Sequence, residues 1–304
     1  MSLACISAAW AVHAAPADDP LLRPIEPEYA KRWLAPQKPV QLFGNSYLVG
    51  FGGLSVGLIR TSAGLILIDG AVPQAVPEVE KNLRTLGFSI RDVKYILSTE
   101  PHYDHAGGIA ALTRDSGATV LASAEGARIL KAGGRNPADP QASLLAPFPV
   151  PARIRAVRDG EVIKLGNVAV TAVATPGHTL GSMSWRWRSC EEKTCVNALF
   201  ASSLNPASAD GYRFSDPANR SISEAFRRSF ARMRAERCGL LLTAHPDQSD
   251  GDARYARLLR QRKPNPFIDP GACRVYADRF EAALDKRLSK EISQAQQQLA
   301  PQNQ

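Results

Sequence analysis

The stretch Glu100-Pro101-His102-Tyr103-Asp104-His105-Ala106-Gly107-Gly108 crowds two imidazoles and two carboxylates into six consecutive residues. It directly follows the apolar run Val93 to Leu97, which is typical of a buried β-strand. Imidazole and carboxylate groups hold Zn²⁺ in proteins, and about three of them with one open position suffice for a catalytic metal. These side chains at the end of a strand therefore predict a metal site.

Two further histidines lie far along the chain, in Thr175-Pro-Gly-His178 and Thr243-Ala-His245-Pro. Each follows an apolar run with β-strand character, Val168 to Ala174 and Leu240 to Thr243. Strand ends bring ligands to one edge of a sheet, so we expect both histidines to join the same metal site. Histidines scattered over core or surface would be the alternative, but the only other histidine is His13, near the N-terminus.

The composition is that of a globular chain with 304 residues, of which 44% are hydrophobic. No apolar run reaches the roughly 18–20 residues that a membrane span requires. The net charge of +8 and the isoelectric point of 9.4 could indicate nucleic-acid binding. Lysine and arginine are dispersed, however, and no aromatic residues alternate with them. We expect solubility and attraction of anionic small molecules, without nucleic-acid binding.

The N-terminus resembles a secretory leader. Leu3 to Val12 is a short apolar run, and Val12-His13-Ala14 offers small residues at cleavage spacing, although no Lys or Arg precedes the run. A buried N-terminal helix is the alternative, which Pro16 and Pro20 disfavour. We therefore predict a periplasmic protein. Its segments are a signal peptide at 1–15, one domain at 16–295 and a disordered polar tail at 296–304.

Cysteine usage also favours export. Without Cys5 of the leader, four cysteines remain, and four allow three pairings. Cys190 and Cys195 flank a short loop between two expected strands, so a disulfide across a hairpin is plausible. Cys238 and Cys273 end one helical pattern and begin another, so a second disulfide would join two helices. Four reduced thiols, typical of cytosolic proteins, are the alternative.

The predicted elements alternate between strand-rich and helical stretches. Strands are expected at 40–49, 54–60, 65–68, 93–97, 119–122, 153–157, 162–165, 168–174, 183–187, 196–201 and 240–243. Helices are expected at 76–86, 107–115, before Gly133, and at 223–236, 252–261 and 272–295. The long loop from Gly133 to Pro151 is typical of a lid or binding loop. Strand-rich stretches closed by helices occur twice, which predicts an α/β (α+β) fold of two packed β-sheets with helices on both outer faces. The metal site then lies at the seam between the two halves.

These motifs resemble the metallo-β-lactamase superfamily, and within it subclass B3. The resemblance spans Trp33 to Arg274 and includes the following segments: Asn45 to Gly50, Leu65 to Gly70, Pro101 to Gly108, Thr175 to Ser182, Ser202 to Leu204, and His245. Related thioesterases and lactonases usually have a bridging Asp near Ser203, and other lactamases a Cys. The resemblance implies the four-layer αββα sandwich.

The resemblance also implies two zinc ions. Residues 100, 102 and 178 would bind the first, and Asp104, His105 and His245 the second. Most family members have a histidine where this chain has Glu100. Since Glu ligates zinc in other enzymes, we expect Glu100 to be a ligand of a weaker first site, with an outer hydrogen-bond acceptor as the alternative. Asp69 would not bind the metal itself but would orient one of its ligands through a hydrogen bond. The alternative is that Asp69 is only the turn residue that ends a strand.

The implied activity is that of a zinc β-lactamase (EC 3.5.2.6) acting on penicillins, cephalosporins and carbapenems through a metal-bound hydroxide. Asp104 would orient this nucleophile, while Ser203 and Asn205 would bind the drug's carboxylate or simply serve as turn residues. The sequence contains no Ser-x-x-Lys motif, so we do not expect a mechanism with a covalent serine intermediate. We expect a small-molecule substrate and a monomer. The alternatives are a lactonase or thioesterase of this fold, a zinc-binding protein with little or no catalysis, and a metal-dependent nuclease, which the leader disfavours.

Overall fold

The computed structural model describes residues 19–299 and contains two mixed β-sheets. The seven strands of the first sheet lie in chain order: β1 (Val40–Phe43), β2 (Ser46–Leu48), β3 (Gly57–Thr61), β4 (Gly64–Ile68), β5 (Val93–Leu97), β6 (Thr119–Ser123) and β7 (Ile154–Val157). The second sheet has the order β12 (Leu240–Thr243), β11 (Thr194–Ala201), β10 (Met183–Glu191), β9 (Val168–Ala174) and β8 (Val162–Leu165). Strands β4 to β7 run parallel, as do β11 and β12, and the other neighbours are antiparallel.

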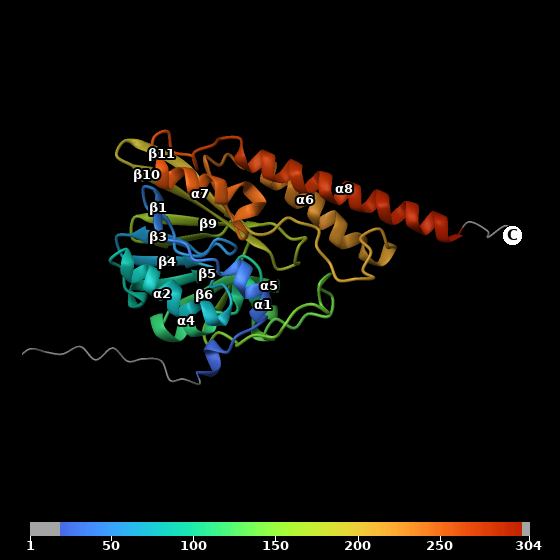
Figure 1. The fold of residues 1–304 in the computed structure, drawn as a ribbon, viewed down its shortest axis with the longest axis horizontal. Coiled ribbons are helices and arrows are strands. Elements are labelled where there is room, and N and C mark those ends of the chain that lie inside the picture. The colour runs from blue at the N-terminus through green and yellow to red at the C-terminus, as the bar shows by residue number, and fades with distance from the viewer. Residues whose placement is uncertain (1–18, 300–304) are drawn as a thin grey trace, which may run out of the picture.

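Helices cover both outer faces, as Figure 1 shows. The helices of the N-terminal half are α1 (Pro27–Trp33), α2 (Val76–Thr85), α3 (Tyr103–Ala106), α4 (Ile109–Ser116) and α5 (Ala124–Lys131). Those of the C-terminal half are α6 (Arg220–Ala235), α7 (Gly251–Arg260) and α8 (Ala272–Leu299). Short 3₁₀ turns are η1 (Pro20–Leu22), η2 (Pro73–Ala75), η3 (Ile90–Asp92), η4 (Pro217–Asn219) and η5 (Pro246–Ser249). Among the described helices, none is long and apolar enough to cross a membrane.

Alternating side chains build the layers. In β4, Leu65 and Leu67 pack with α2 and α4, whereas Ile66 and Ile68 face the core between the sheets. This is the two-residue period of a strand whose faces are both buried. Residues from both sheets fill the central core, and β11, β12, α6 and α8 enclose a third apolar cluster. The predicted αββα sandwich is confirmed.

Several predicted boundaries were wrong. The single strand expected at 40–49 is a hairpin, because Gly44 turns the chain with a φ of +52°. A Cβ on Gly44 would lie 2.3 Å from the carbonyl oxygen of Cys190, so only glycine fits there. The strand expected from Leu54 begins at Gly57, and the helix expected at 107–115 is α4, which begins at Ile109 and is preceded by the separate short helix α3. The predicted signal peptide, residues 1–15, lies outside the described residues.

The C-terminal helix extends beyond the predicted end of the domain. Helix α8 continues through Leu299, whereas a tail was predicted from residue 296, and residues 300–304 lie outside the described part. Two side chains fasten α8 to the loop that follows β11. Arg287 donates to the carbonyl of Pro206 (2.9 Å) and pairs with Glu291 (2.8 Å), whose other oxygen accepts from the Ser215 amide (2.8 Å).

The structure brings the cysteines together in the predicted pairs. The Sγ atoms of Cys190 and Cys195 are 2.11 Å apart, on facing residues of β10 and β11. The Sγ atoms of Cys238 and Cys273 are 1.99 Å apart; Cys238 lies two residues before β12, and Cys273 is the second residue of α8. The second pair thereby ties α8 to the second sheet.

Candidate metal centre

Three strand ends deliver the six predicted ligands. Glu100 and His102 lie between β5 and α3, and α3 carries Asp104 and His105. His178 follows β9, and His245 lies between β12 and η5. The loop after β5 is fixed by Asp69, whose carboxylate accepts from the amide (2.7 Å) and hydroxyl (2.6 Å) of Thr99. The predicted outer position of Asp69 thus corresponds to an anchor for the ligand loop.

Glu100, His102 and His178 form the first cluster, with ligand atoms within 4.8 Å of one another. All three side chains are buried. The Nδ1–H of His178 donates to the carbonyl oxygen of Asn205 (2.9 Å), which leaves Nε2 as the nitrogen that faces the cluster. Nε2 of His102 lies 3.1 Å from a carboxylate oxygen of Asp139, which leaves Nδ1 for a metal.

The second cluster contains Asp104, His105 and His245. The Nε2 atoms of His105 and His245 are 3.1 Å apart. An oxygen of Asp104 lies 3.2 Å from Nε2 of His105 and 3.3 Å from Nε2 of His245. Ligands bound at about 2.0–2.1 Å in a tetrahedron are separated by about 3.3 Å, so this triangle fits a zinc-sized ion. Nδ1–H of His245 donates to the carbonyl of Gly53 (3.0 Å), which orients the ring.

Glu100 belongs to the first cluster and also approaches the second. Its Oε2 accepts from the amide of Ser203 (2.8 Å). The other oxygen, Oε1, is buried without a hydrogen bond, 3.6 Å from His178 Nε2 and 3.1 Å from His105 Nε2. A buried carboxylate oxygen without a partner is costly unless a cation satisfies it. The donor set therefore fits a divalent metal, and Glu100 is placed where Oε1 could serve as one of its ligands.

The charges of the ligands depend on one another. Burial alone would raise the pKa of Glu100, but the neighbouring imidazoles of His105 and His178 hold it below its ordinary value. Burial would lower the pKa of His105, yet the carboxylates of Asp104 and Glu100 raise it to about 10. Burial raises the pKa of Asp69 to about 7, against the opposing effect of His105. A cation bound at these atoms would replace the imidazole protons.

Solved structures with the same overall fold are similar in sequence to this chain over most of its length. One solved structure, described as the first B3 metallo-β-lactamase with an active-site glutamic acid, is 52% identical over 90% of this chain and 99% of its own, with a TM-score of 0.83. The chain belongs to the metallo-β-lactamase superfamily. The family model described as metallo-β-lactamase superfamily matches residues 49–191. MEM-A1, a subclass B3 metallo-β-lactamase from a soil metagenome library, is 44% identical over 86% of this chain and 99% of its own, with a TM-score of 0.83. The predicted similarity to subclass B3 is confirmed.

Curated relatives within the superfamily give a more distant match. A hydroxyacylglutathione hydrolase from Rhodobacter capsulatus is 32% identical over 117 residues, which are 38% of this chain and 38% of that protein. The matched region thus spans well under half the length of this curated relative. This match therefore covers only part of the chain, whereas the solved structures match most of it.

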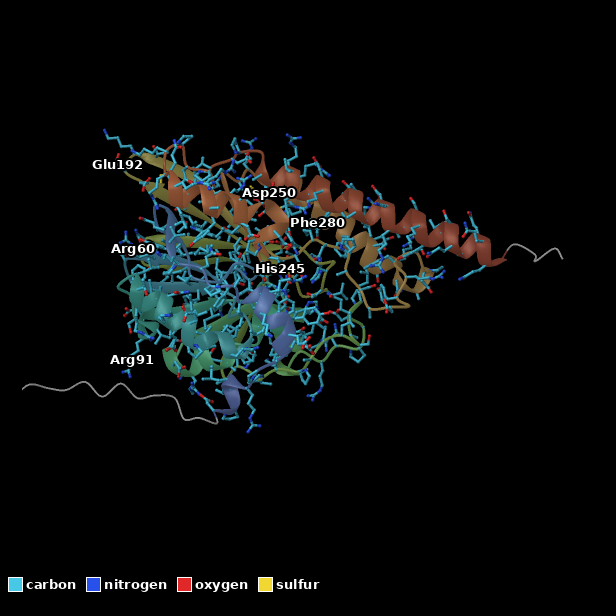
Figure 2. All side chains as sticks on the ribbon, in the orientation of Figure 1. Arg60, Arg91, Glu192, His245, Asp250 and Phe280 are labelled. Carbon is cyan, nitrogen blue, oxygen red and sulfur yellow. A yellow bond between two sulfur atoms is a disulfide. The ribbon has the colours of Figure 1, made fainter. Side chains whose placement is uncertain are left out.

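In this superfamily member the metal ligands open into a cavity of about 670 Å³. Its lining includes four ligands, together with Tyr29 and Trp33 of α1, Gln141 and Leu144 of the 133–151 loop, and Arg279 and Phe280 of α8. Figure 2 labels two of the lining residues, His245 and Phe280, toward the middle of the molecule in this view. The loop that the sequence singled out as a lid therefore forms one wall of the cavity.

The two predicted substrate-binding residues lie in different surroundings. Asn205 lines the cavity, whereas Ser203 is fully buried and does not. The hydroxyl of Ser203 lies 3.5 Å from the side-chain amide nitrogen of Gln248, a residue that does line the cavity. Ser203 contributes its backbone amide to Glu100 instead, because the chain after β11 passes directly beneath that carboxylate.

Sequence reasoning missed three residues that shape the site. Asp139 holds His102, and the side-chain amide nitrogen of Gln141 lies 3.2 Å from His178 Nε2. Gly53 accepts from His245 and leaves room for α1, since a Cβ there would lie 2.6 Å from Trp33 Cα. Asp139 and Gln141 belong to the loop predicted to be functional. Their position in that loop was the only feature of the sequence that pointed to them.

Proposed function

We propose that the protein is a zinc-dependent β-lactamase (EC 3.5.2.6) that opens the lactam ring of penicillins, cephalosporins and carbapenems. The observation that supports this most is the geometry of Glu100. Its Oε1 atom accepts no hydrogen bond and lies 3.6 Å from His178 of the first cluster and 3.1 Å from His105 of the second, behind the ligands that line the open cavity. The similarity to a subclass B3 enzyme with an active-site glutamic acid, over nearly the whole chain, supports the same proposal.

The side chains have distinct tasks in this proposal. Bound zinc supplies Lewis acidity toward the lactam carbonyl and activates a water for attack. Asp104 both completes the second site and presents a carboxylate that orients the attacking water. The carbonyls of Asn205 and Gly53 keep the rings of His178 and His245 in their ligating orientation. We propose two zinc ions per chain, with the Glu100 site the weaker.

A thioester hydrolase is the second candidate, because the curated relatives that match are hydroxyacylglutathione hydrolases. The segment after β11 disfavours it. This chain has Ser202 and Ser203 where related thioesterases usually have a bridging Asp, and both serines are fully buried. A carboxylate that bridges two metals would have to be supplied by another residue.

We propose that the protein is exported to the periplasm as a monomer with two disulfides. The apolar leader at 1–15 and the pairing of Cys190 with Cys195 and of Cys238 with Cys273 support export. Oxidised cysteines are typical of that compartment. Cell fractionation and peptide mapping under non-reducing conditions test this proposal, and free thiols at all four positions would contradict it.

Hydrolysis assays test the activity directly. The purified protein should open nitrocefin, a penicillin and a carbapenem, lose these activities on chelation and regain them with zinc. Asp104→Asn should abolish turnover, whereas Asp216→Asn, which changes an exposed capping residue far from the ligands in sequence, should not. Rates equal to buffer for all three drugs, with hydrolysis of a glutathione thioester, would favour the second candidate. Metal binding without any turnover would indicate a zinc-binding protein.

A further inference from the structure

A cationic side chain of α8 lies in the wall of the metal cavity. Arg279 is exposed and lines the cavity together with His245 and Asp104. Its Nη1 donates to two backbone carbonyls, those of Asp247 (3.2 Å) and Gln248 (3.0 Å). Both carbonyls belong to η5, which begins directly after the ligand His245. The guanidinium is thus held by the same turn that follows a metal ligand.

This guanidinium has no counter-ion in the part of the chain that the structure describes. No carboxylate of residues 19–299 lies within 4.0 Å of Arg279. Glu26 and Asp247 also line the cavity without pairing with it, and Arg32 of α1 adds a second exposed cation. Because Nη1 makes both backbone contacts, Nη2 and Nε remain for a ligand. An oriented guanidinium with free donors matches the geometry of a carboxylate.

Of the two residues expected to bind the drug's carboxylate, Ser203 does not line the cavity and Asn205 is uncharged. Ser203 is fully buried behind Glu100, so its hydroxyl does not face the cavity. Asn205 lines the cavity but carries no charge. Lactam drugs of the three proposed classes carry a carboxylate next to the lactam nitrogen, and its recognition requires a donor on the cavity wall.

We propose that Arg279 binds the carboxylate of the substrate and so selects anionic lactams. This inference rests on the proposed β-lactamase function and adds to it the residue that recognises the charge. The contact forms before the lactam opens and persists while it opens, so it stabilises substrate and transition state alike. Its loss should therefore raise KM by about tenfold and change kcat less than about twofold, since the site is partly exposed to water.

A matched pair of substrates tests the inference. The free acid of nitrocefin and its methyl ester differ only in the carboxylate. Arg279→Gln removes the charge while keeping an amide that can donate to the η5 carbonyls, and Arg279→Lys keeps the charge. Arg274→Gln is the control, because Arg274 is an exposed arginine five residues earlier on α8, beside Asp278, and does not line the cavity.

We expect Arg279→Gln to raise KM for the acid about tenfold and to leave the ester unchanged. Arg279→Lys should retain part of the preference for the acid, and Arg274→Gln all of it. Zinc content should be equal in all four proteins. An equal effect on acid and ester, a fall in kcat with loss of zinc, or no effect at all would overturn the role of Arg279 while leaving the β-lactamase intact. A parent protein that hydrolyses neither substrate would overturn both proposals.

Discussion

Replacing Asp139 by alanine should weaken the first zinc site and spare the second. Asp139 is the carboxylate that lies 3.1 Å from Nε2 of His102, and both side chains are nearly inaccessible, with 2% and 4% of their surfaces exposed. The contact fixes which ring nitrogen faces the metal and raises the basicity of that nitrogen. In the D139A variant the ring could rotate, and its buried N–H would lack an acceptor.

Two estimates give the size of this effect. Loss of an outer partner of a metal-ligating histidine typically costs about 10–100-fold in metal affinity, or about 1.4–2.7 kcal/mol. A buried donor left without its acceptor costs about 1–3 kcal/mol. The ranges overlap, so a weakening of the first site by one to two orders of magnitude is expected. His245, in the second site, is held by Gly53 and should not change.

Zinc titration by calorimetry on the metal-free protein measures both sites. We expect Asp139→Ala to shift only the weaker of two binding events, and Asp139→Asn to shift it less, because an amide oxygen can still accept from His102. Asp216→Ala serves as the control, since Asp216 caps η4 and contacts no ligand. An unchanged first event, or an equal shift in both, would refute the reasoning.

Three further outcomes are expected. Glu100→His should tighten the first zinc in the same titration, and two equally tight sites that the change leaves unaltered would contradict this. Replacing Cys238 and Cys273 by serine should lower the free energy of unfolding by about 3–4 kcal/mol, because the disulfide closes a loop across a sequence separation of 35 residues; an unchanged denaturation midpoint would contradict the bond. Burial would raise the pKa of Glu291, but Arg287 holds it below its ordinary value, so its stabilisation is present at neutral pH and is lost as the pH falls through that lowered pKa. Glu291→Gln should flatten the acid limb of stability against pH in denaturant titrations, and an acid limb as steep as the parent's would contradict this.

The sequence predicted those parts of the site that follow strong apolar patterns. His178 and His245 each follow a buried strand. Predicting where these two strands end was therefore enough to predict where both histidines lie. Asp139 lies in a loop with no periodicity, and a lone aspartate there is typical of any turn. Its role depends on how that loop folds back over His102, which involves contacts distant in sequence.

Other features depended on tertiary contacts that no local pattern encodes. Gly44 divides an apolar run into a hairpin because β10 leaves no room for a side chain at that point. Ser203 looks like a solvent-facing hydroxyl in a polar segment, but the passage of the chain beneath Glu100 buries it. The polar end of α8 remains helical through Leu299, beyond the point where Arg287 and Glu291 hold it to the loop after β11.

The metal centre also joins the two halves of the molecule. Glu100 and His105 lie just after a strand of the first sheet, whereas His178 and His245 lie just after strands of the second, and each cluster takes ligands from both. An ion bound at either cluster would therefore link the two sheets through its ligands. A ligand that binds only the folded state at 1,000 times its dissociation constant adds about 4 kcal/mol to stability. With zinc as the proposed ion, a shortage of zinc would lower the stability of the folded protein as well as the proposed activity.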